Sequence, residues 1–427
     1  MATGPIVILL NITLCNLYKN LNSNWGFLNF VDGLLENNIP AWLTVLIILG
    51  YGLFSVIISL LCKYYTRVFY NEVETVDTAF TGGGQLSAGL IMTNLVSQWT
   101  WAATLLQSSG VGIQYGLSGP LWYASGACIQ LIIFSTVSVM LKIRAPGAIT
   151  FLQVIRARFG TVAHVVFCVF ALLTNLIVSS MLMLGASTVL TQMTMGLSVE
   201  LSALLLVLVI GISVATGNLA CTYYISYFTS SALLVCIIAF TIRFFNIHHQ
   251  EEHDPYKSFD AIYDMIFCRP TDPSNFNSSY FTILSTRGLM FGVVNIIGNF
   301  GTVFVDQSYW AASVAAKPSE GVIGFILGGI VWFAIPFTFG TVCSLFYLSI
   351  GTALGNDFLT QTQVDSGLAP IAIATFLFGS SGKAVVIAMV VIAVTTTASS
   401  EVYAVTSILI YDIYATYMKV SLDYLDC

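Results

Sequence analysis

The sequence predicts an all-α integral membrane protein built as a bundle of apolar helices, and two observations support this fold class. Of the 427 residues, 57% are hydrophobic and 8% are charged, whereas a soluble domain carries about 25% charged residues. Apolar runs of about 20 residues recur along the chain, and each is long enough to cross a hydrocarbon core of about 30 Å as a helix. The runs do not alternate polar and apolar residues, which argues against a β-barrel.

Hydropathy and helix punctuation predict nine membrane spans. The first is an extra helix ahead of a longer core, and the second and seventh contain polar or glycine-rich interruptions. The expected spans cover residues 41–62, 84–109, 119–141, 163–193, 199–216, 220–243, 287–308, 321–350 and 382–410.

Basic residues in the short loops predict which side of the membrane is cytoplasmic. If the first span runs from outside to inside, these residues gather on one side, which the positive-inside rule makes cytoplasmic. Residues 1–40 and 244–286 are then extracellular, with the N-terminus outside, and 411–427 form a cytoplasmic tail. The sequons at Asn11 and Asn277 fall outside and predict glycosylation. The basic residues are Lys63, Arg67, Lys142, Arg144, Arg156, Arg158, Lys317 and Lys419.

The remaining short motifs give little sign of chemistry. The nine cysteines form no CxxC pair or Cys/His cluster, so most read as small buried hydrophobes. Cys15 and Cys268 both fall in outer segments, and whether they pair is left open. The polar stretch 248–254 favours a solvated loop over a metal site, because no second cluster has zinc spacing. We expect no cleaved leader, no enzyme activity, no organic cofactor and no nucleic-acid partner.

The second span places polar and aromatic residues where lipid would favour apolar ones. In its stretch TNLVSQWTW, Asn94, Gln98 and Trp101 share one helical face. Polar groups inside a membrane usually face a bundle interior or a watery cavity. Single hydroxyls such as Thr93 and Ser97 are explained well by helix packing. Two amides and two tryptophans within eight residues instead favour a functional surface.

Two later spans add to this pattern. In the seventh, Gly298, Asn299, Gly301 and Thr302 weaken a regular helix, so we expect a break there. In the ninth, a run of hydroxyls at residues 395–400 ends in the carboxyl group of Glu401. Such an oxygen-rich surface suits a cation that sheds its water. Two discontinuous helices and a hydroxyl-rich one indicate a secondary transporter built from inverted repeats.

Three stretches resemble the sodium:solute symporter family, specifically its urea active transporter branch. They are SQWTWAATLLQSSGVGIQYGLSGPLWYASGA, NFGTVFVDQSYW and SSEVYAVTSILIYDIY. The resemblance implies a ten-helix core of two inverted five-helix repeats behind the extra helix at 41–62. Residues 84–243 would form the first repeat and 287–410 part of the second. Because the chain stops at Cys427, just after the eighth core helix, we expect a truncated core.

The resemblance also implies a cation site. In the family, two carbonyls of the first core helix face a carbonyl and two hydroxyls of the eighth. The branch is generally described as proton-coupled, so the coupling cation stays open between H+ and Na+. Glu401 adds a carboxyl group that could carry a proton. The residues at the family's cation-site positions are Met92 and Leu95 for the first two carbonyls, Ala393 for the third, and Thr396 and Thr397 for the hydroxyls.

The solute site departs from that of the family's sugar carriers. Asn94 is retained, whereas Trp99 replaces a sugar-contacting histidine and Thr302 and Val303 replace an aromatic pair. Urea is small, neutral and planar, so amides, hydroxyls and a flat aromatic surface would match it. We expect the lining to be Asn94, Gln98, Trp99, Asn299 and Thr302, with Trp101 beside them.

The leading hypothesis is therefore a symporter in the lipid bilayer, in the plasma membrane, that imports urea with H+ or Na+ by alternating access. One alternative is a truncated, non-transporting isoform or fragment with a regulatory role. Another is a carrier of polyamines or a different small solute. The sequence does not predict an oligomeric state.

Overall fold

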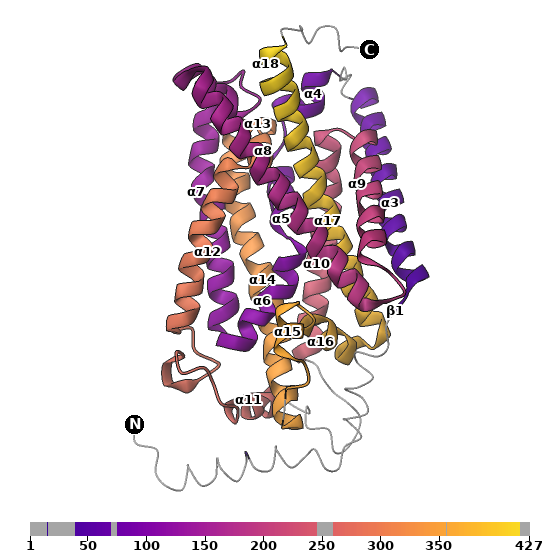
Figure 1. Cartoon of the computed structure of the whole chain (residues 1–427), viewed down its shortest axis with the longest axis vertical. Helices are drawn as coiled ribbons and strands as arrows, with labels where there is room; N and C mark the ends of the chain where they lie inside the picture. Colours follow the sequence, from indigo (N-terminus) through magenta and orange to yellow (C-terminus); the bar gives the residue numbers. More distant parts are fainter. Residues whose placement is uncertain (1–14, 16–38, 70–74, 246–258, 356, 419–427) are drawn as a thin grey trace.

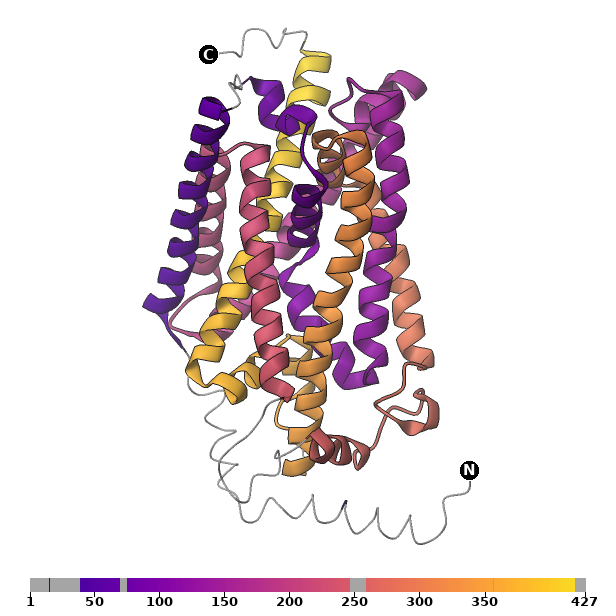
Figure 2. The ribbon, with the colours of Figure 1, turned by 180° about the vertical axis from the view of Figure 1, so that it is seen from behind.

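The computed structural model describes residues 15, 39–69, 75–245, 259–355 and 357–418. Most of them lie in helices that run along one elongated bundle, seen from two sides in Figure 1 and Figure 2. A short parallel pair joins β1 (Ile39–Pro40) to β2 (Thr194–Met195). The main helices are α3 (Ala41–Phe69), α5 (Ala88–Trp99), α6 (Ala102–Tyr115), α7 (Ser118–Arg144), α8 (Phe151–Met193), α9 (Val199–Thr216), α10 (Leu219–Phe245), α12 (Thr286–Val305), α14 (Pro318–Leu354), α16 (Ala369–Phe378) and α17 (Ser380–Ser407).

Short elements cap the two ends of this bundle. At one end lie the segments that precede α5, the second half of a broken helix and the continuation of α17 (Figure 1). They are α4 (Val76–Thr81), η2 (Gly82–Gly84), α13 (Gln307–Ala315), the π-helix η4 (Ile408–Tyr414) and α18 (Ala415–Tyr417). At the other end lie α11 (Phe259–Phe267), η3 (Phe276–Ser278) and α15 (Gln361–Asp365).

The all-α membrane fold that the sequence predicts is confirmed. Within the described residues, eight helices are long and apolar enough to cross a membrane. The second expected span, 84–109, is instead two short helices, α5 and α6. The fourth begins earlier than expected, at Phe151, and Gly160 interrupts it with a φ of 83°.

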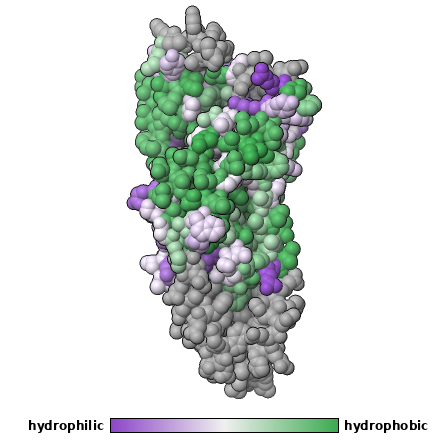
Figure 3. All heavy atoms as spheres, turned by 90° about the vertical axis from the view of Figure 1, so that its right-hand side faces the viewer, coloured by the Kyte–Doolittle hydropathy of each residue, from purple (hydrophilic) through white to green (hydrophobic). Residues whose placement is uncertain are grey.

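The outer surface of the bundle is apolar, as contact with lipid requires. Leu53 on α3 and Leu204 on α9 are each 63% exposed. Figure 3 shows hydrophobic side chains over most of the middle of this face and more hydrophilic ones toward its ends. A soluble protein rarely exposes an apolar surface of this extent, so the bundle is organised for a hydrocarbon environment.

Both expected helix breaks are present, but only one lies where the sequence predicts it. The first falls at Thr100 and Trp101, inside the polar stretch of the second span. The second falls at Asp306, between α12 and α13. The expected break at 298–302 is wrong, because α12 stays helical through Gly298 and Gly301. The glycines lower helix stability without ending the helix, since the hydrogen-bond ladder can continue through them.

Close backbone approach fixes the turn from α6 to α7. Gly116 has a φ of 64°, and a Cβ atom there would lie 2.0 Å from the carbonyl oxygen of Tyr280. The neighbouring Leu117 amide donates to that carbonyl at 2.8 Å. Only glycine fits this position, so the loop after η3 is anchored to the α6–α7 turn.

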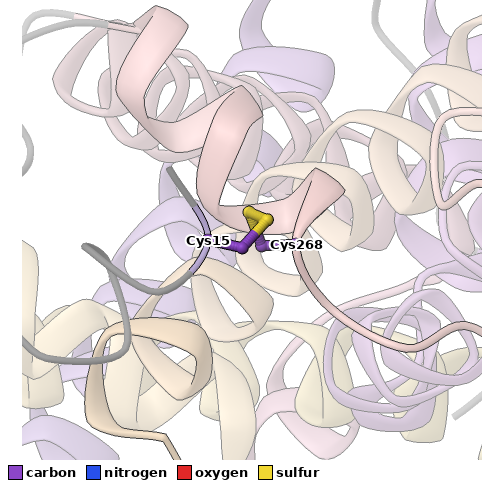
Figure 4. The surroundings of a disulfide bond; sticks show 2 residues. All are labelled: Cys15 and Cys268. Atoms are coloured by element: carbon purple, nitrogen blue, oxygen red, sulfur yellow. A yellow bond between two sulfur atoms is a disulfide. The ribbon is translucent and has the colours of Figure 1, made fainter. Parts of the chain in front are cut away.

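The end of the bundle that carries α11 holds a disulfide. Cys15 and Cys268 are bonded, with their Cα atoms 5.3 Å apart (Figure 4). The sequence left this pairing open. Asn277 of the second sequon is exposed, whereas Asn11 and the polar stretch 248–254 lie outside the described residues.

Candidate functional site

The polar stretch of the second span is buried in the centre of the bundle. α5 has no charged residue, and seven of its side chains from Thr93 to Trp99 are buried. α5 packs mainly against α14 and α10. Asn94 and Gln98, one turn apart, join through a bond of 3.2 Å from Asn94 Nδ2 to Gln98 Oε1. Ser226 of α10 donates to the Asn94 Oδ1 atom at 3.2 Å, so the amide is held from two helices.

Aromatic rings gather around the first break. Trp99 contacts Trp101, Tyr309 and Trp332, with ring centroids 5.8, 5.3 and 6.1 Å away. The Trp99 indole donates to the carbonyl of Ala127 at 2.8 Å. Trp101 is only half-buried, and its indole donates to the Gln98 carbonyl at 3.2 Å. The two tryptophans thus hold the α5–α6 break from the side of α7, α13 and α14.

A chain of polar contacts connects the two breaks. Gln98 Nε2 donates to Ser308 Oγ at 2.6 Å, and Ser308 Oγ donates to Glu401 Oε1 at 3.3 Å. Ser308 lies in the first turn of α13, directly after the second break. All three side chains are at least 97% buried. The chain therefore joins α5, α13 and α17 through the interior of the bundle.

Glu401 belongs to a second cluster that includes Asn175 of α8 and Asp306. The Asn175 amide nitrogen donates to Glu401 Oε2 at 2.6 Å and to Asp306 Oδ1 at 3.0 Å. Asp306 also caps α13, because its Oδ1 accepts from the Ser308 backbone amide at 2.8 Å. One amide thus bridges two buried carboxyl groups on different helices.

The residues expected at the cation site are only partly brought together. The Ala393 carbonyl accepts from both Thr396 Oγ1 and Thr397 Oγ1. Thr397 also reaches α5, donating to the Ser97 carbonyl at 3.4 Å. Thr396 instead lines a small cavity that α17 shares with α3, α9 and α10. The two hydroxyls therefore point to different neighbours in this conformation.

The carbonyls that α5 was expected to contribute to the cation site are those of Met92 and Leu95. Met92 and Leu95 are within the regular helix α5 and not in an unwound segment. A Cβ atom on Gly328 of α14 would lie 3.6 Å from the Met92 carbonyl oxygen and 3.2 Å from the Leu95 Cβ atom. That carbonyl thus faces α14. A role for these residues in cation binding stays a prediction.

Two of the residues expected to line the solute site lie on α12, away from the cluster around Gln98. Asn299 donates to Asn295 Oδ1 at 2.8 Å, and Thr302 donates to the Gly298 carbonyl at 3.4 Å. Both side chains are half-buried, and their hydrogen bonds stay within α12. α12 packs chiefly on α7, and for this reason Asn299 and Thr302 do not reach α5.

Sequence reasoning missed Asn175, Ser308 and the central role of Asp306. Asn175 is the one amide in an apolar stretch of α8, and a polar residue at such a depth is a signal by itself. The local pattern around Asp306 does not identify the helices that it contacts. In the described residues, no group of three or more His, Cys, Asp or Glu side chains could hold a metal ion.

Comparison with known proteins agrees with this architecture. Residues 79–423 match the model of the sodium:solute symporter family. The urea-proton symporter DUR3 of Oryza sativa is 39% identical over 392 residues, covering 87% of this chain and 53% of that protein. The probable urea active transporter 1 of Schizosaccharomyces pombe is 36% identical, covering 87% and 56%. The chain spans about half the length of these relatives.

A solved structure shares the fold. The substrate-bound outward-open state of a Na+-coupled sialic acid symporter superimposes with a TM-score of 0.64 at 14% identity, covering 89% of this chain and 75% of that one. At this identity the likeness concerns the fold alone. The family match covers most of the chain, and both relatives are transporters and not enzymes. The chain belongs to the sodium:solute symporter family.

Proposed function

We propose that this protein acts as a secondary active symporter that imports urea together with a cation. The observation that carries the proposal is the buried polar chain from Asn94 through Gln98 and Ser308 to Glu401, which connects the two helix breaks. In transporters of this type, solute and ion bind near such breaks. The names of the relatives, urea-proton symporter and urea active transporter, support urea as the solute.

The groups at the first break suit a small neutral amide. Gln98 and Asn94 provide amide donors and acceptors, and Trp99 and Trp101 provide flat aromatic surfaces. We propose Asn94, Gln98, Trp99 and Trp101 as the lining. Asn299 and Thr302 can join it only if α12 moves relative to α5. Alternating access would require such relative movement of helices.

We propose a plasma-membrane location with the end that carries α4 and α18 in the cytoplasm. The C-terminal turns of α3 and α7 carry Arg67, Lys142 and Arg144, and α8 begins at the same end with Arg156 and Arg158 (Figure 1). The disulfide lies at the opposite end, which fits an oxidising exterior. Asn277 is exposed at that end and available for glycosylation.

A cationic solute is the second candidate, and the pair of carboxyl groups favours it. Glu401 and Asp306 are both buried, and neither has an ion-pair partner among the described residues. A polyamine could supply the missing positive charge. This candidate predicts that urea transport is absent while polyamine uptake is present.

Uptake of labelled urea in proteoliposomes tests the proposal. It is run with imposed H+ or Na+ gradients, on this chain and on a version extended to the length of its relatives. We expect one gradient to drive accumulation of urea above the outside concentration. Uptake that ignores both gradients would indicate a facilitator, and uptake of putrescine in place of urea would favour the cationic solute.

A matched pair of variants tests the role of α17. Thr397→Ala removes the hydroxyl that bonds to the Ser97 carbonyl, and we expect gradient-driven uptake to fall at least about tenfold. Thr406→Ala is the control, because Thr406 is half-exposed and bonds only within its own helix. Equal uptake by both variants would show that Thr397 has no part in coupling.

A further inference from the structure

One amide side chain bridges two carboxyl groups that are buried in the bundle interior. Asn175 Nδ2 lies 2.6 Å from Glu401 Oε2 and 3.0 Å from Asp306 Oδ1. The three residues come from α8, α17 and the α12–α13 break. Asn175, Asp306 and Glu401 are 0%, 1% and 2% exposed. The cluster is therefore sealed from solvent in this conformation.

The cluster has more acceptors than donors. The Asn175 amide, the Ser308 backbone amide and the Ser308 hydroxyl are the donors that reach the two carboxyl groups. Asp306 Oδ2 and Asn175 Oδ1 are buried and have no hydrogen-bond partner. An unpaired buried acceptor costs about 1–3 kcal/mol. A proton on either carboxyl group would add the missing donor.

Within the described part of the chain, neither Asp306 nor Glu401 has an ion-pair partner. α5 and α13 have no charged residue. The charged residues of α8 and α12 lie near the N-terminal ends of these helices, and so does the one charged residue of α17 besides Glu401. Tyr309 of α13 is a further titratable side chain that interacts with the pair. Two carboxylates that share one amide donor repel each other, and a low-dielectric interior makes it costly to ionise both.

We propose that Asp306 and Glu401 form a proton-binding site, and that Asn175 positions the two carboxyl groups to share one proton. The assignment of this proton as the coupling ion rests on the proposed function. The binding step forms one O–H bond, between a proton from water on one side of the membrane and a carboxylate oxygen. The release step breaks that bond and returns the proton to water on the other side.

The same contacts suggest how solute and proton communicate. Ser308 Oγ accepts from Gln98 at 2.6 Å and donates to Glu401 at 3.3 Å. A solute that takes over the Gln98 amide removes one of the bonds that hold the Ser308 hydroxyl. The hydroxyl can then reorient, which changes the stabilisation of an ionised Glu401. Solute binding and protonation of the pair are linked through this single side chain.

Infrared difference spectroscopy of the purified chain tests proton binding without any need for transport. We expect the carbonyl stretch of a protonated carboxylic acid at neutral pH, and its loss in the double variant Asp306→Asn/Glu401→Gln. The single variants Asp306→Asn and Glu401→Gln, which keep the shape of the side chain, should each change the band. If the double variant does not fold, the singles still carry the test.

Asp412→Asn is the matched control, because Asp412 is equally buried but has His164 as a partner 3.1 Å away. Its band should match that of the wild-type chain. A band that survives in the double variant, or in both single variants, would overturn the proposal, as would an equal loss in Asp412→Asn. These outcomes do not depend on whether urea is the solute.

Transport distinguishes coupling from proton binding. In the extended version, Glu401→Gln should abolish accumulation driven by a pH gradient. Accumulation that persists at the wild-type level would contradict a coupling role. A protein with no urea transport in any variant would refute the proposed function, and the spectroscopic result would still decide the proton site.

Discussion

The two helix breaks differ in how their free backbone groups are hydrogen-bonded. At the α5–α6 break, uncharged side chains of the same segment form these bonds. Thr100 donates to the Val96 carbonyl at 2.6 Å, and Thr104 Oγ1 accepts from the Trp101 amide at 3.2 Å. At the α12–α13 break, a single carboxyl group caps α13 and relies on Asn175 of another helix.

The difference separates a self-contained break from a conditional one. At the first break, the hydrogen bonds to the backbone come from residues within a few positions, so these bonds should persist when neighbouring helices shift. The second depends on contacts between three helices and on the protonation of Asp306 and Glu401. A movement or a proton that disturbs these contacts can change the second break while the first keeps its shape.

The largest effect expected at the first break comes from its aromatic group. Trp99→Ala removes a buried ring that contacts three others, and we expect the free energy of unfolding to fall by about 3–5 kcal/mol. Trp42→Ala is the control, since Trp42 is 66% exposed. Thermal unfolding in detergent measures both, and a comparable loss in the two variants would show that the aromatic group does not hold the break.

A smaller effect is expected where the breaks are connected. Gln98→Leu leaves the Asn94 amide without its acceptor and removes a donor from Ser308. We expect a loss of about 1–3 kcal/mol in the free energy of unfolding. Gln107→Leu, at an exposed position of α6, should change it little. If the two variants have the same free energy of unfolding, the polar chain between the breaks does not stabilise the fold.

The smallest effect is expected at the cap of α6. Thr104→Ala removes the acceptor for the Trp101 amide, and N-cap losses cost about 1 kcal/mol. Thr136→Ala on α7 is the control, since its exposed hydroxyl bonds only to the Ile133 carbonyl. Denaturant unfolding resolves the difference, and an unchanged midpoint for Thr104→Ala would mean that the first break does not need its local cap.

The sequence predicts the first break and most of its side chains because the signals are local. Asn94, Gln98, Trp99 and Trp101 stand within eight positions of one span, and the structure buries the first three together. It does not predict where the second break falls, because Gly298 and Gly301 favour a break at a point where α12 stays helical. Thr396 and Thr397 are neighbours in sequence, but successive helical positions point in different directions.

By itself, the sequence determined that this chain is a helical membrane protein, because length and hydropathy of the spans are properties of each segment alone. It also determined that polar groups lie within the second and ninth spans. Only the tertiary structure decided that Asn175, Asp306 and Glu401 meet, and that Ser308 connects them to Gln98. The reason is physical: each contact joins residues on different helices, and which helix faces meet depends on packing across the whole bundle.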